Sequence, residues 1–297
     1  MSNNIPPQQL HIPVLLKQVV EQLAPRPGES YLDLTAGYGG HARAILAQTK
    51  APERAVLVDR DQMAIDALQP LAGTGTTIVH DSYASYAQNA SEAGKRFDMI
   101  LVDLGVSSPQ LDKANRGFSI KRDGPLDMRM DQRQQRTAAD IVNAASKADL
   151  VEILERYGEE PKRQAQRIAD AIIQARPVQT TNILATVILN THRGAYKKTH
   201  PATRTFQAIR IALNDELGQL EQLLKLLPSL LTPGGRVAII SFHSLEDRLV
   251  KRFFREQANA GYEAELDLLT GKAIRGKLYD GSNPRARSSL LRAAVKK

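Results

Sequence analysis

The stretch that decides the fold class reads Asp33-Leu-Thr-Ala-Gly37-Tyr-Gly39-Gly40-His41. It overlaps the end of an apolar run at residues 31–34, which is typical of a strand, and leads directly into a helical pattern at residues 41–47. Glycine lets the chain turn sharply and lets a ligand approach the backbone without a Cβ in between. The stretch therefore predicts a strand–loop–helix unit whose loop holds a ligand beyond the carboxyl end of the strand.

The alternation of strand and helix continues over the first hundred residues. Apolar runs at residues 55–59, 77–80 and 97–104 predict strands, and residues 62–68 and 85–93 predict helices. Strands that are apolar throughout, rather than alternating, are buried on both faces. The pattern therefore predicts an α/β, Rossmann-like fold of right-handed βαβ units, with a mostly parallel sheet between two helical layers.

The pattern changes in the middle of the chain. Residues 112–199 contain no convincing strand but carry helical patterns at 148–156 and 163–175. A helix at 215–227, a turn at Thr232–Gly235 and a buried strand at 236–242 then return to the sheet pattern. We therefore predict a discontinuous domain, residues 1–112 and 213–297, interrupted by an all-helical insertion at residues 113–212.

Two nucleotide cofactors fit the glycine-rich loop. Gly37, Gly39 and Ala42 match the spacing of the dinucleotide fingerprint, which makes NAD one candidate. Asp33, four residues before Gly37, would crowd a pyrophosphate but suits the cationic amino-acid moiety of S-adenosylmethionine (SAM). Asp59 ends the next strand and can accept hydrogen bonds from both ribose hydroxyls. The residues favour SAM, with NAD and an ordinary tight turn as alternatives.

The next two strand ends supply candidates for the adenine and for the methyl acceptor. Tyr83 follows the third strand and either stacks on a base or fills the core. The fourth strand ends at Asp103, and Ser108-Pro109-Gln110 is a partial echo of the Asp/Asn/Ser-Pro-Pro-aromatic motif of amino methyltransferases. An exocyclic amine is a poor nucleophile, and an oxygen acceptor together with close positioning activates it. Asp103 is the best-placed acid, either for this acceptor or for the cofactor.

His243 is a second candidate catalytic residue. It follows the late strand in Ser241-Phe-His-Ser244, so its position in the sheet could bring it to the acceptor side. A single histidine after a buried strand more often has a structural role, and both interpretations stay open here.

Composition excludes several kinds of chemistry. The chain contains no cysteine, which excludes disulfides, thiolate metal sites and a cysteine nucleophile. No His/Asp/Glu cluster has convincing ligand spacing, so we expect no metal. No apolar run approaches the ~20 residues of a membrane helix, and the start lacks the pattern of a secretion signal. We therefore expect a cytoplasmic protein that does not interact with a membrane.

Charge is unevenly distributed along the chain. The net charge is +8, yet residues 171–214 hold six basic residues and no acid, and residues 271–297 hold eight basic residues and one acid. Basic segments on an otherwise acidic chain suggest surfaces for a polyanion, although solvated faces would give the same count.

Eight motifs together resemble one family, and the resemblance runs nearly from end to end. The motifs are His11-Ile-Pro-Val-Leu15, Asp33-x-Thr-x-Gly-x-Gly-Gly-His41, Asp103-Leu-Gly-Val-Ser-Ser-Pro-Gln110, Arg116-Gly-Phe-Ser119, Asp123-Gly-Pro-Leu-Asp-Met-Arg-Met-Asp131, His200-Pro-Ala-Thr-Arg-Thr-Phe-Gln207, Ser241-Phe-His-Ser-Leu-Glu-Asp-Arg248 and Asn283-Pro-Arg-Ala-Arg-Ser288. They are similar to those of the bacterial 16S ribosomal RNA (cytosine-N4)-methyltransferases, and the Asp123–Asp131 block is highly specific.

This resemblance implies a class I methyltransferase fold with SAM as methyl donor. It also implies that the acceptor is the N4 amine of cytosine 1402, in the decoding centre of 16S rRNA. The cofactor contacts it implies are Gly39, Gly40, His41, Asp59, Tyr83, Asp103 and Gln110.

The same resemblance makes 16S rRNA in the small ribosomal subunit the expected partner. Lys197, Lys198 and Arg204 in the insertion are then the first candidates for phosphate contacts, and an ion pair or helix cap is the alternative role of Arg204. The target base would need to be exposed or extruded into the pocket. The helical insertion also offers surfaces on which a homodimer could form.

Two other functions remain compatible with the residues alone. A nicotinamide-dependent oxidoreductase would bind NAD and not SAM. A ribosome-assembly factor would bind rRNA tightly and transfer no methyl group.

Overall fold

The computed structural model describes residues 13–192 and 200–297, which form two units. The first unit comprises the residues up to Gly105 together with Gly218–Lys297, and the second comprises Val106–Leu217. The predicted insertion, residues 113–212, differs from this second unit by several residues at each end.

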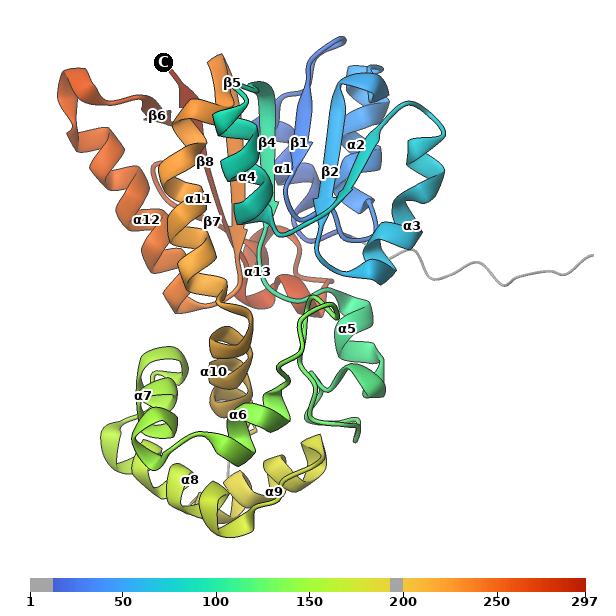
Figure 1. The fold of residues 1–297 in the computed structure, drawn as a ribbon. Helices are drawn as coiled ribbons and strands as arrows, with labels where there is room; N and C mark the ends of the chain where they lie inside the picture. Colours follow the sequence, from blue (N-terminus) through green and yellow to red (C-terminus); the bar gives the residue numbers. More distant parts are fainter. Residues whose placement is uncertain (1–12, 193–199) are drawn as a thin grey trace, which may run out of the picture. The chain divides into compact units, whose positions relative to one another are not determined.

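The first unit is built on a mostly parallel sheet (Figure 1). Its strands are β1 (Tyr31–Asp33), β2 (Ala55–Asp59), β3 (Thr77–His80), β4 (Phe97–Asp103), β5 (Leu231–Ser241), β6 (Leu266–Leu268), β7 (Ile274–Arg275) and β8 (Leu290–Lys296). The strand order is β3-β2-β1-β4-β5-β8-β6, with β7 also paired to β8. β8 runs antiparallel to its neighbours, while β1 to β5 are parallel to one another. The predicted Rossmann-like fold class is confirmed.

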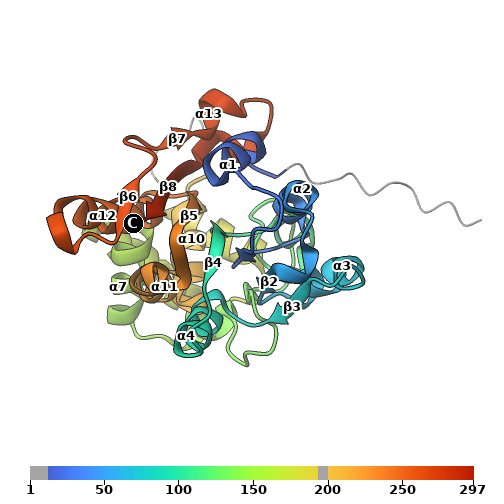
Figure 2. The same cartoon turned by 90° about the horizontal axis from the view of Figure 1, so that it is seen from above.

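Helices cover both faces of this sheet because its strands are apolar on both faces. They are α1 (Leu16–Leu23), α2 (Gly40–Thr49), α3 (Gln62–Ala72), α4 (Tyr83–Glu92), α11 (Glu216–Leu230), α12 (Ser244–Asn259) and the short α13 (Gly276–Tyr279). Within β4, Ile100 and Val102 pack with residues of α4, α11 and α12, whereas Met99 and Leu101 pack with residues of α1, α2 and α3. Figure 2 shows the two sets of helices on opposite sides of the sheet. Of the expected helices, residues 41–47, 62–68, 85–93 and 215–227 fall on α2, α3, α4 and α11.

The expected turn at Thr232–Gly235 was wrong. These residues belong to β5, whose pairing with β4 shifts from Phe97–Leu231 to Met99–Arg236. The four residues are therefore accommodated as an irregularity in the strand, and the positive φ of 76° at Gly234 fits such a distortion. Thr232 still bonds β4 through its side chain, because its Oγ1 lies 3.0 Å from Oδ1 of Asp98.

The second unit is helical. Its helices are α5 (Ser108–Asp112), α6 (Ala138–Ala144), α7 (Lys147–Gly158), α8 (Lys162–Ala175), α9 (Thr181–Thr191) and α10 (Thr203–Asn214). Its described residues contain one isolated bridge, Pro125–Thr180, and no strand of the sheet. The expected helices at 148–156 and 163–175 correspond to α7 and α8.

A long connection, residues 113–137, joins α5 to α6 and is fixed by buried polar contacts. Arg116 is 1% exposed, and its guanidinium donates to the carbonyl of Arg129 at 2.9 Å. Asn214 bridges the same connection, because its side chain accepts from the amide of Met130 and donates to the carbonyl of Met128, each at 2.9 Å. Met128 has a φ of 55°, a conformation that is costly for a residue with a Cβ.

No helix among residues 13–192 and 200–297 is long and apolar enough to cross a membrane.

Candidate active site

The sheet places its site where the strand order changes direction. β1 has β2 on one side and β4 on the other, so the loops that leave β1 and β4 diverge at their carboxyl ends. Open α/β sheets bind ligands in the crevice at this position. Asp33, Asp59 and Asp103 are the last residues of β1, β2 and β4. Parallel pairing thus brings three carboxylates to one edge of the sheet.

The conformation of the loop after β1 depends on glycine. Gly37 and Gly39 have φ values of 52° and 76°, which residues with a Cβ rarely adopt. The amide of Ala36 donates to the carbonyl of Val58 in β2 at 2.9 Å, and the amide of Gly39 donates to the carbonyl of Ala36 at 2.8 Å. The loop is therefore a defined cradle that lies between β1 and the start of α2.

Gly40, the first residue of α2, is required for a different reason. A Cβ built on Gly40 would lie 2.4 Å from Cγ of Pro13, so the ring of Pro13 occupies the space of a side chain. This contact packs the segment before α1 onto the start of the loop's helix.

We expect Gly40→Ala to lower the free energy of unfolding by ~1–3 kcal/mol, because Pro13 would have to move. Chemical denaturation measures this change. Gly73→Ala is the matched control: Gly73 has an α-helical φ of −61°, and the nearest atom to an added Cβ is a carbonyl oxygen at 3.6 Å. Equal unfolding midpoints for Gly40→Ala and wild type would contradict the packing role of Gly40.

Asp59 is fixed against this cradle. Its Oδ2 accepts from the amide of Gly37 and its Oδ1 from the amide of Asp61, both at 2.8 Å. Burial raises the pKa of the Asp59 carboxyl, and the two amide bonds oppose that shift. Each carboxylate oxygen has further lone pairs, so Asp59 can still accept from the hydroxyls of a ribose.

Asp33 lies behind the loop and is almost fully buried. Its Oδ2 accepts from the hydroxyl of Tyr31 at 2.7 Å, and its Oδ1 accepts from the amide of Thr35 at 3.2 Å. Burial raises the pKa of Asp33 to about 7, and the charge of Asp59 adds to the shift. An acid at this position suits a cationic group and disfavours the pyrophosphate of NAD.

Asp103 has the feature that most clearly indicates a binding site, a buried side-chain oxygen without a partner among the described residues. Its Oδ1 is buried and has no hydrogen-bond partner among the described residues, while its Oδ2 lies 3.8 Å from Nε2 of His41. The backbone amide of Asp103 donates to Oγ1 of Thr35 at 2.6 Å, which ties the end of β4 to the loop after β1. A buried oxygen without a partner is costly and is expected where a ligand supplies the donor.

Neighbouring charges also act on Asp103. Burial raises the pKa of its carboxyl well above the usual range, and the negative charges of Asp33 and Glu246 add to this effect. The site is thus a cluster of acids that is completed by a cationic or N–H-bearing ligand. Both the sulfonium and the ammonium of SAM, and the amine of a base, meet this requirement.

His243 is a helix cap in the structure. It is the N-cap of α12, where its Nδ1 accepts from the amide of Glu246 at 3.4 Å. The Glu246 carboxylate reciprocates, since its Oε2 accepts from the amides of Phe242 and His243 at 2.8 and 3.3 Å. The Nε2 of His243 also lies 3.1 Å from Oε1 of Glu246. These contacts account for His243 structurally, and a catalytic role for it stays a prediction.

Glu246 was not anticipated as part of the site. It is 2% exposed and close enough to Asp103 to affect its pKa. An acid three residues after a candidate N-cap is the sequence signal of a capping box, and that signal could have identified it.

The other predicted residues are placed as follows. Tyr83 is buried at the start of α4 within the apolar cluster of that face. Gln110 belongs to the second unit, where its side-chain oxygen accepts from the amide of Ser107 at 2.9 Å. Their contacts with a cofactor stay predictions.

The candidate phosphate-binding residues belong to the second unit or lie outside the described residues. The Nη1 of Arg204 is 4.0 Å from Oε2 of Glu160, in an ion pair that leaves the Arg204 side chain 60% exposed. Lys197 and Lys198 are outside the described residues. No group of three or more His, Cys, Asp or Glu side chains capable of holding a metal occurs in the described part of the chain.

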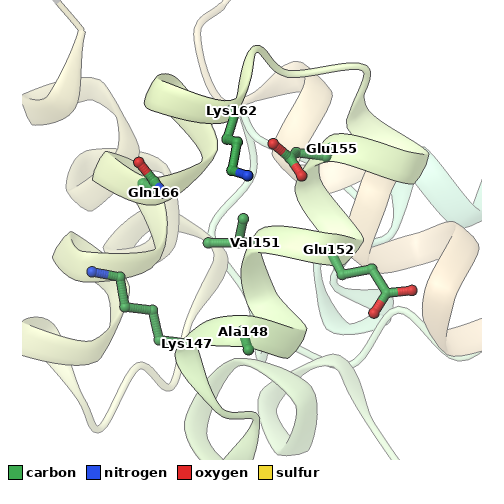
Figure 3. Close-up of a pocket in the computed structure, with 7 residues that line it drawn as sticks. All are labelled: Lys147, Ala148, Val151, Glu152, Glu155, Lys162 and Gln166. Carbon is green, nitrogen blue, oxygen red and sulfur yellow. The ribbon is translucent and has the colours of Figure 1, made fainter.

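The second unit has a surface depression between α7 and α8 (Figure 3). Acidic Glu152 and Glu155 come from α7, while Lys162 and Gln166 come from α8. This mixed and open lining contains none of the predicted site residues.

Comparison with known proteins identifies the family of the chain. Residues 8–297 match the model of the MraW methylase family. A curated relative from Cyanothece sp., named ribosomal RNA small subunit methyltransferase H, is 49% identical over 299 residues, which cover 98% of this chain and 96% of the relative.

Solved structures of methyltransferases are more distant. The N-methyltransferase NodS from Bradyrhizobium japonicum is 10% identical, with a TM-score of 0.44 over 95% of this chain and 93% of that one. An rRNA methylase from Streptococcus thermophilus is 12% identical, with a TM-score of 0.37 over 95% of this chain and 93% of that one.

The family match covers almost the whole chain, and the three strand-end carboxylates fit its chemistry. The protein therefore belongs to the MraW methylase family and is a methyltransferase whose methyl donor is SAM.

Proposed function

We propose that the protein methylates the N4 amine of cytosine 1402 in 16S rRNA, in the cytoplasm, with the small ribosomal subunit or its precursor as partner. The name of the Cyanothece relative supports small-subunit rRNA as the substrate class. The motifs at Asp103–Gln110 and Asp123–Asp131 support the finer assignment through their resemblance to cytosine-N4 enzymes.

The observation that carries the proposal is the buried Asp103 oxygen with no hydrogen-bond partner among the described residues. An amine N–H would supply the missing donor. A hydrogen bond from the amine to this oxygen orients the nitrogen lone pair and offsets the positive charge that develops on nitrogen as it is alkylated. The positive charge of bound SAM would favour the carboxylate form of Asp103, which can then take the proton that the nitrogen releases.

SAM supplies an electrophilic methyl group on a sulfonium. Asp59 would hold its ribose hydroxyls, and Asp33 would lie on the side of its ammonium. Gly39 and Gly40 would contact the cofactor through the backbone of the loop, as the family motif implies. His41 would contact the cofactor beside Asp103, as the family motif implies.

In the second unit, we propose that the insertion recognises RNA. Lys197, Lys198 and Arg204 are its candidate phosphate contacts, because basic side chains that neutralise phosphates supply most of the affinity for nucleic acid. Assembly as a homodimer is a further proposal, and sedimentation at several protein concentrations tests it.

Mass spectrometry of 16S rRNA tests the function directly. Cells that lack the gene should carry unmethylated N4 at cytosine 1402, and re-introducing the wild-type gene should restore the mark. A gene carrying Asp103→Ala should fail to restore it. An unchanged modification pattern in the deletion strain would refute the proposed function.

The raised pKa of Asp33, about 7, predicts that SAM binds more tightly as the pH rises. Below this pH the carboxyl is neutral, and above it the carboxylate attracts the ammonium of SAM, so the association constant should increase by up to about tenfold per pH unit below 7. Calorimetric titrations between about pH 5 and 7, where the α-amino group is mostly protonated, measure this increase.

Asp33→Asn provides the control for this pH dependence. Its side chain stays neutral, so its SAM affinity should be weaker and should rise less with pH over the same range. A wild-type affinity that does not change with pH, or a variant that retains the full wild-type increase, would contradict the role of Asp33.

A further inference from the structure

A basic segment with two exposed apolar side chains lies at the same edge of the sheet as the three carboxylates. We call residues 271–288 the α13 platform; it includes β7, α13 and the 3-10 turn Pro284–Ser288. In β7, Ile274 and Arg275 pair with Leu291 and Leu290 of β8. Leu290 also pairs with Ser241, the last residue of β5. The platform therefore begins at the carboxyl edge of the parallel strands.

The platform is fixed to the segment that packs on the cofactor loop. Oδ2 of Asp280 accepts from the backbone amide of Leu15 at 3.1 Å. Leu15 is two residues after Pro13, whose ring packs on Gly40. Figures 1 and 2 both show α13 on the α1 side of the first unit. The platform and the glycine-rich loop are thus connected through one short segment.

The interior of the platform is tightly packed, so its shape is defined. A Cβ built on Gly276 would lie 2.1 Å from both the carbonyl oxygen of Ala286 and Oγ of Ser289, and Ala286 is completely buried. The side chain of Asn283 caps the 3-10 turn by accepting from the amide of Arg285 at 3.1 Å. This rigid base presents the side chains of α13 to solvent.

The outer surface combines cations with an aromatic ring. Leu278 is 73% exposed and Tyr279 is 62% exposed. Lys272, Arg275, Lys277 and Arg287 are also exposed, and within the described ranges none of these four cations forms an ion pair. The one acid of the platform, Asp280, accepts the bond from Leu15. The surface therefore carries positive charge that no neighbouring acid of the described chain offsets.

The first unit also contains an exposed tyrosine with different surroundings. Tyr262 is fully exposed, but Glu263 follows it directly, and Glu265 and Asp267 come soon after. It precedes β6, whose Leu266 pairs with Lys296 near the end of β8. Because β7 pairs with the start of β8, Tyr262 lies toward the end of the strands that is opposite to the three carboxylates. Of these two exposed tyrosines, the one in the platform is thus the one that lies next to unpaired cations.

Exposed aromatic rings among basic side chains bind single-stranded nucleic acid, because the ring stacks on a base and the cations contact phosphates. We propose that the α13 platform binds unpaired nucleotides next to the methylated base, with Tyr279 stacked on one of them. This inference rests on the proposed function in taking RNA as the substrate. It adds a surface in the methyltransferase unit to the candidates in the insertion.

Fluorescence of a single introduced tryptophan tests the stacking. The chain has no tryptophan, so Tyr279→Trp creates one reporter, and Tyr262→Trp is its matched control. A single-stranded RNA oligonucleotide of mixed sequence should quench the tryptophan of full-length Tyr279→Trp and leave that of Tyr262→Trp unchanged. Tyr279→Ala should weaken binding of the same RNA by about tenfold, the loss of one stacked base. Equal quenching of both reporters, or none, would overturn the proposal.

The salt dependence of binding tests the cations. The double variant Arg275→Ala/Lys277→Ala should reduce the slope of log Kd against log salt by ~1.4, since each single-strand phosphate contact contributes ~0.7. The control is Lys251→Ala/Arg255→Ala on α12, which removes the same charge from an exposed helix surface. The same slope in both double variants would contradict a specific platform.

Two further measurements separate this proposal from the proposed function. Quenching of the Tyr279→Trp reporter by RNA, together with no methylation of 16S rRNA or of the small subunit by the wild-type protein, would uphold the platform and reject the proposed function. Methylation of 16S rRNA with unchanged RNA affinity in Tyr279→Ala would uphold the function and reject the platform. A Tyr279→Ala protein that loses self-association instead of RNA affinity would assign the surface to a second copy of the chain and reject the proposal.

Discussion

Asp59→Ala is expected to raise the Kd for SAM by at least about 100-fold. A charged acceptor contributes ~1.5–3 kcal/mol per hydrogen bond, and Asp59 would accept from two ribose hydroxyls. The substitution also removes the acceptor for the amide of Gly37, which lies 2.8 Å from Oδ2, so the glycine-rich loop would lose a support. Isothermal titration with SAM measures the change.

Asp61→Asn is the matched control for Asp59→Ala. Asp61 is a neighbouring buried acid that caps α3 through its Oδ1, and asparagine preserves that cap. We expect its Kd for SAM to stay within a few-fold of the wild-type value. An Asp59→Ala protein that is folded and binds SAM as tightly as wild type would refute the ribose contact.

Asp103→Asn is expected to lower kcat for methyl transfer by at least about 100-fold. The substitution keeps the shape of the side chain but removes the charge that would offset the positive nitrogen and accept its proton, an effect of ~10²–10⁴ in enzymes. SAM affinity should fall much less than kcat. Single-turnover methyl transfer at saturating SAM and RNA measures the chemical step.

Stability provides an internal check on Asp103→Asn. Because the folded-state pKa of Asp103 is raised, ionisation of this carboxyl opposes folding at neutral pH, and a neutral asparagine should leave the protein at least as stable. For kcat, the control is Asp98→Asn on the same strand. Asp98 lies near the start of β4, away from the site at its end, and its side chain accepts a hydrogen bond from the amide of Ser30. Equal kcat in Asp103→Asn and wild type would remove Asp103 from the mechanism.

The sheet was predictable because the sequence of its strands indicates that both faces are buried. The runs that form β1 to β4 are apolar at successive positions, as burial on both faces requires, and the predicted strands match the observed ones to within about one residue. The helices between them follow from their apolar periodicity. The three carboxylates were found for the same reason, because parallel strands bring their carboxyl ends to one edge.

The late elements depend on tertiary pairing and were not predictable in the same way. Thr232–Gly235 has the composition of a turn, yet it lies within β5, between the residues that pair with Phe97 and Met99 of β4. β6 and β7 have three and two residues, and they exist as strands because β8 pairs with them. Segments this short carry too little periodicity to be assigned from sequence.

Side-chain roles were the least predictable part of the site. His243 and Glu246 form a reciprocal cap, which the sequence pattern allows but which composition cannot distinguish from a catalytic pair. Arg204 forms the ion pair with Glu160 that was its alternative role. The missing partner of the Asp103 oxygen depends on how several strands meet, so only the structure reveals it.

A crystal structure of the protein with S-adenosylhomocysteine, the methylation product of SAM, tests the cofactor site directly. We expect the nucleoside to lie against residues 35–40, with both ribose hydroxyls within hydrogen-bond distance of the Asp59 carboxylate. A nucleoside bound elsewhere, or one whose ribose does not contact Asp59, would refute the proposed cofactor site.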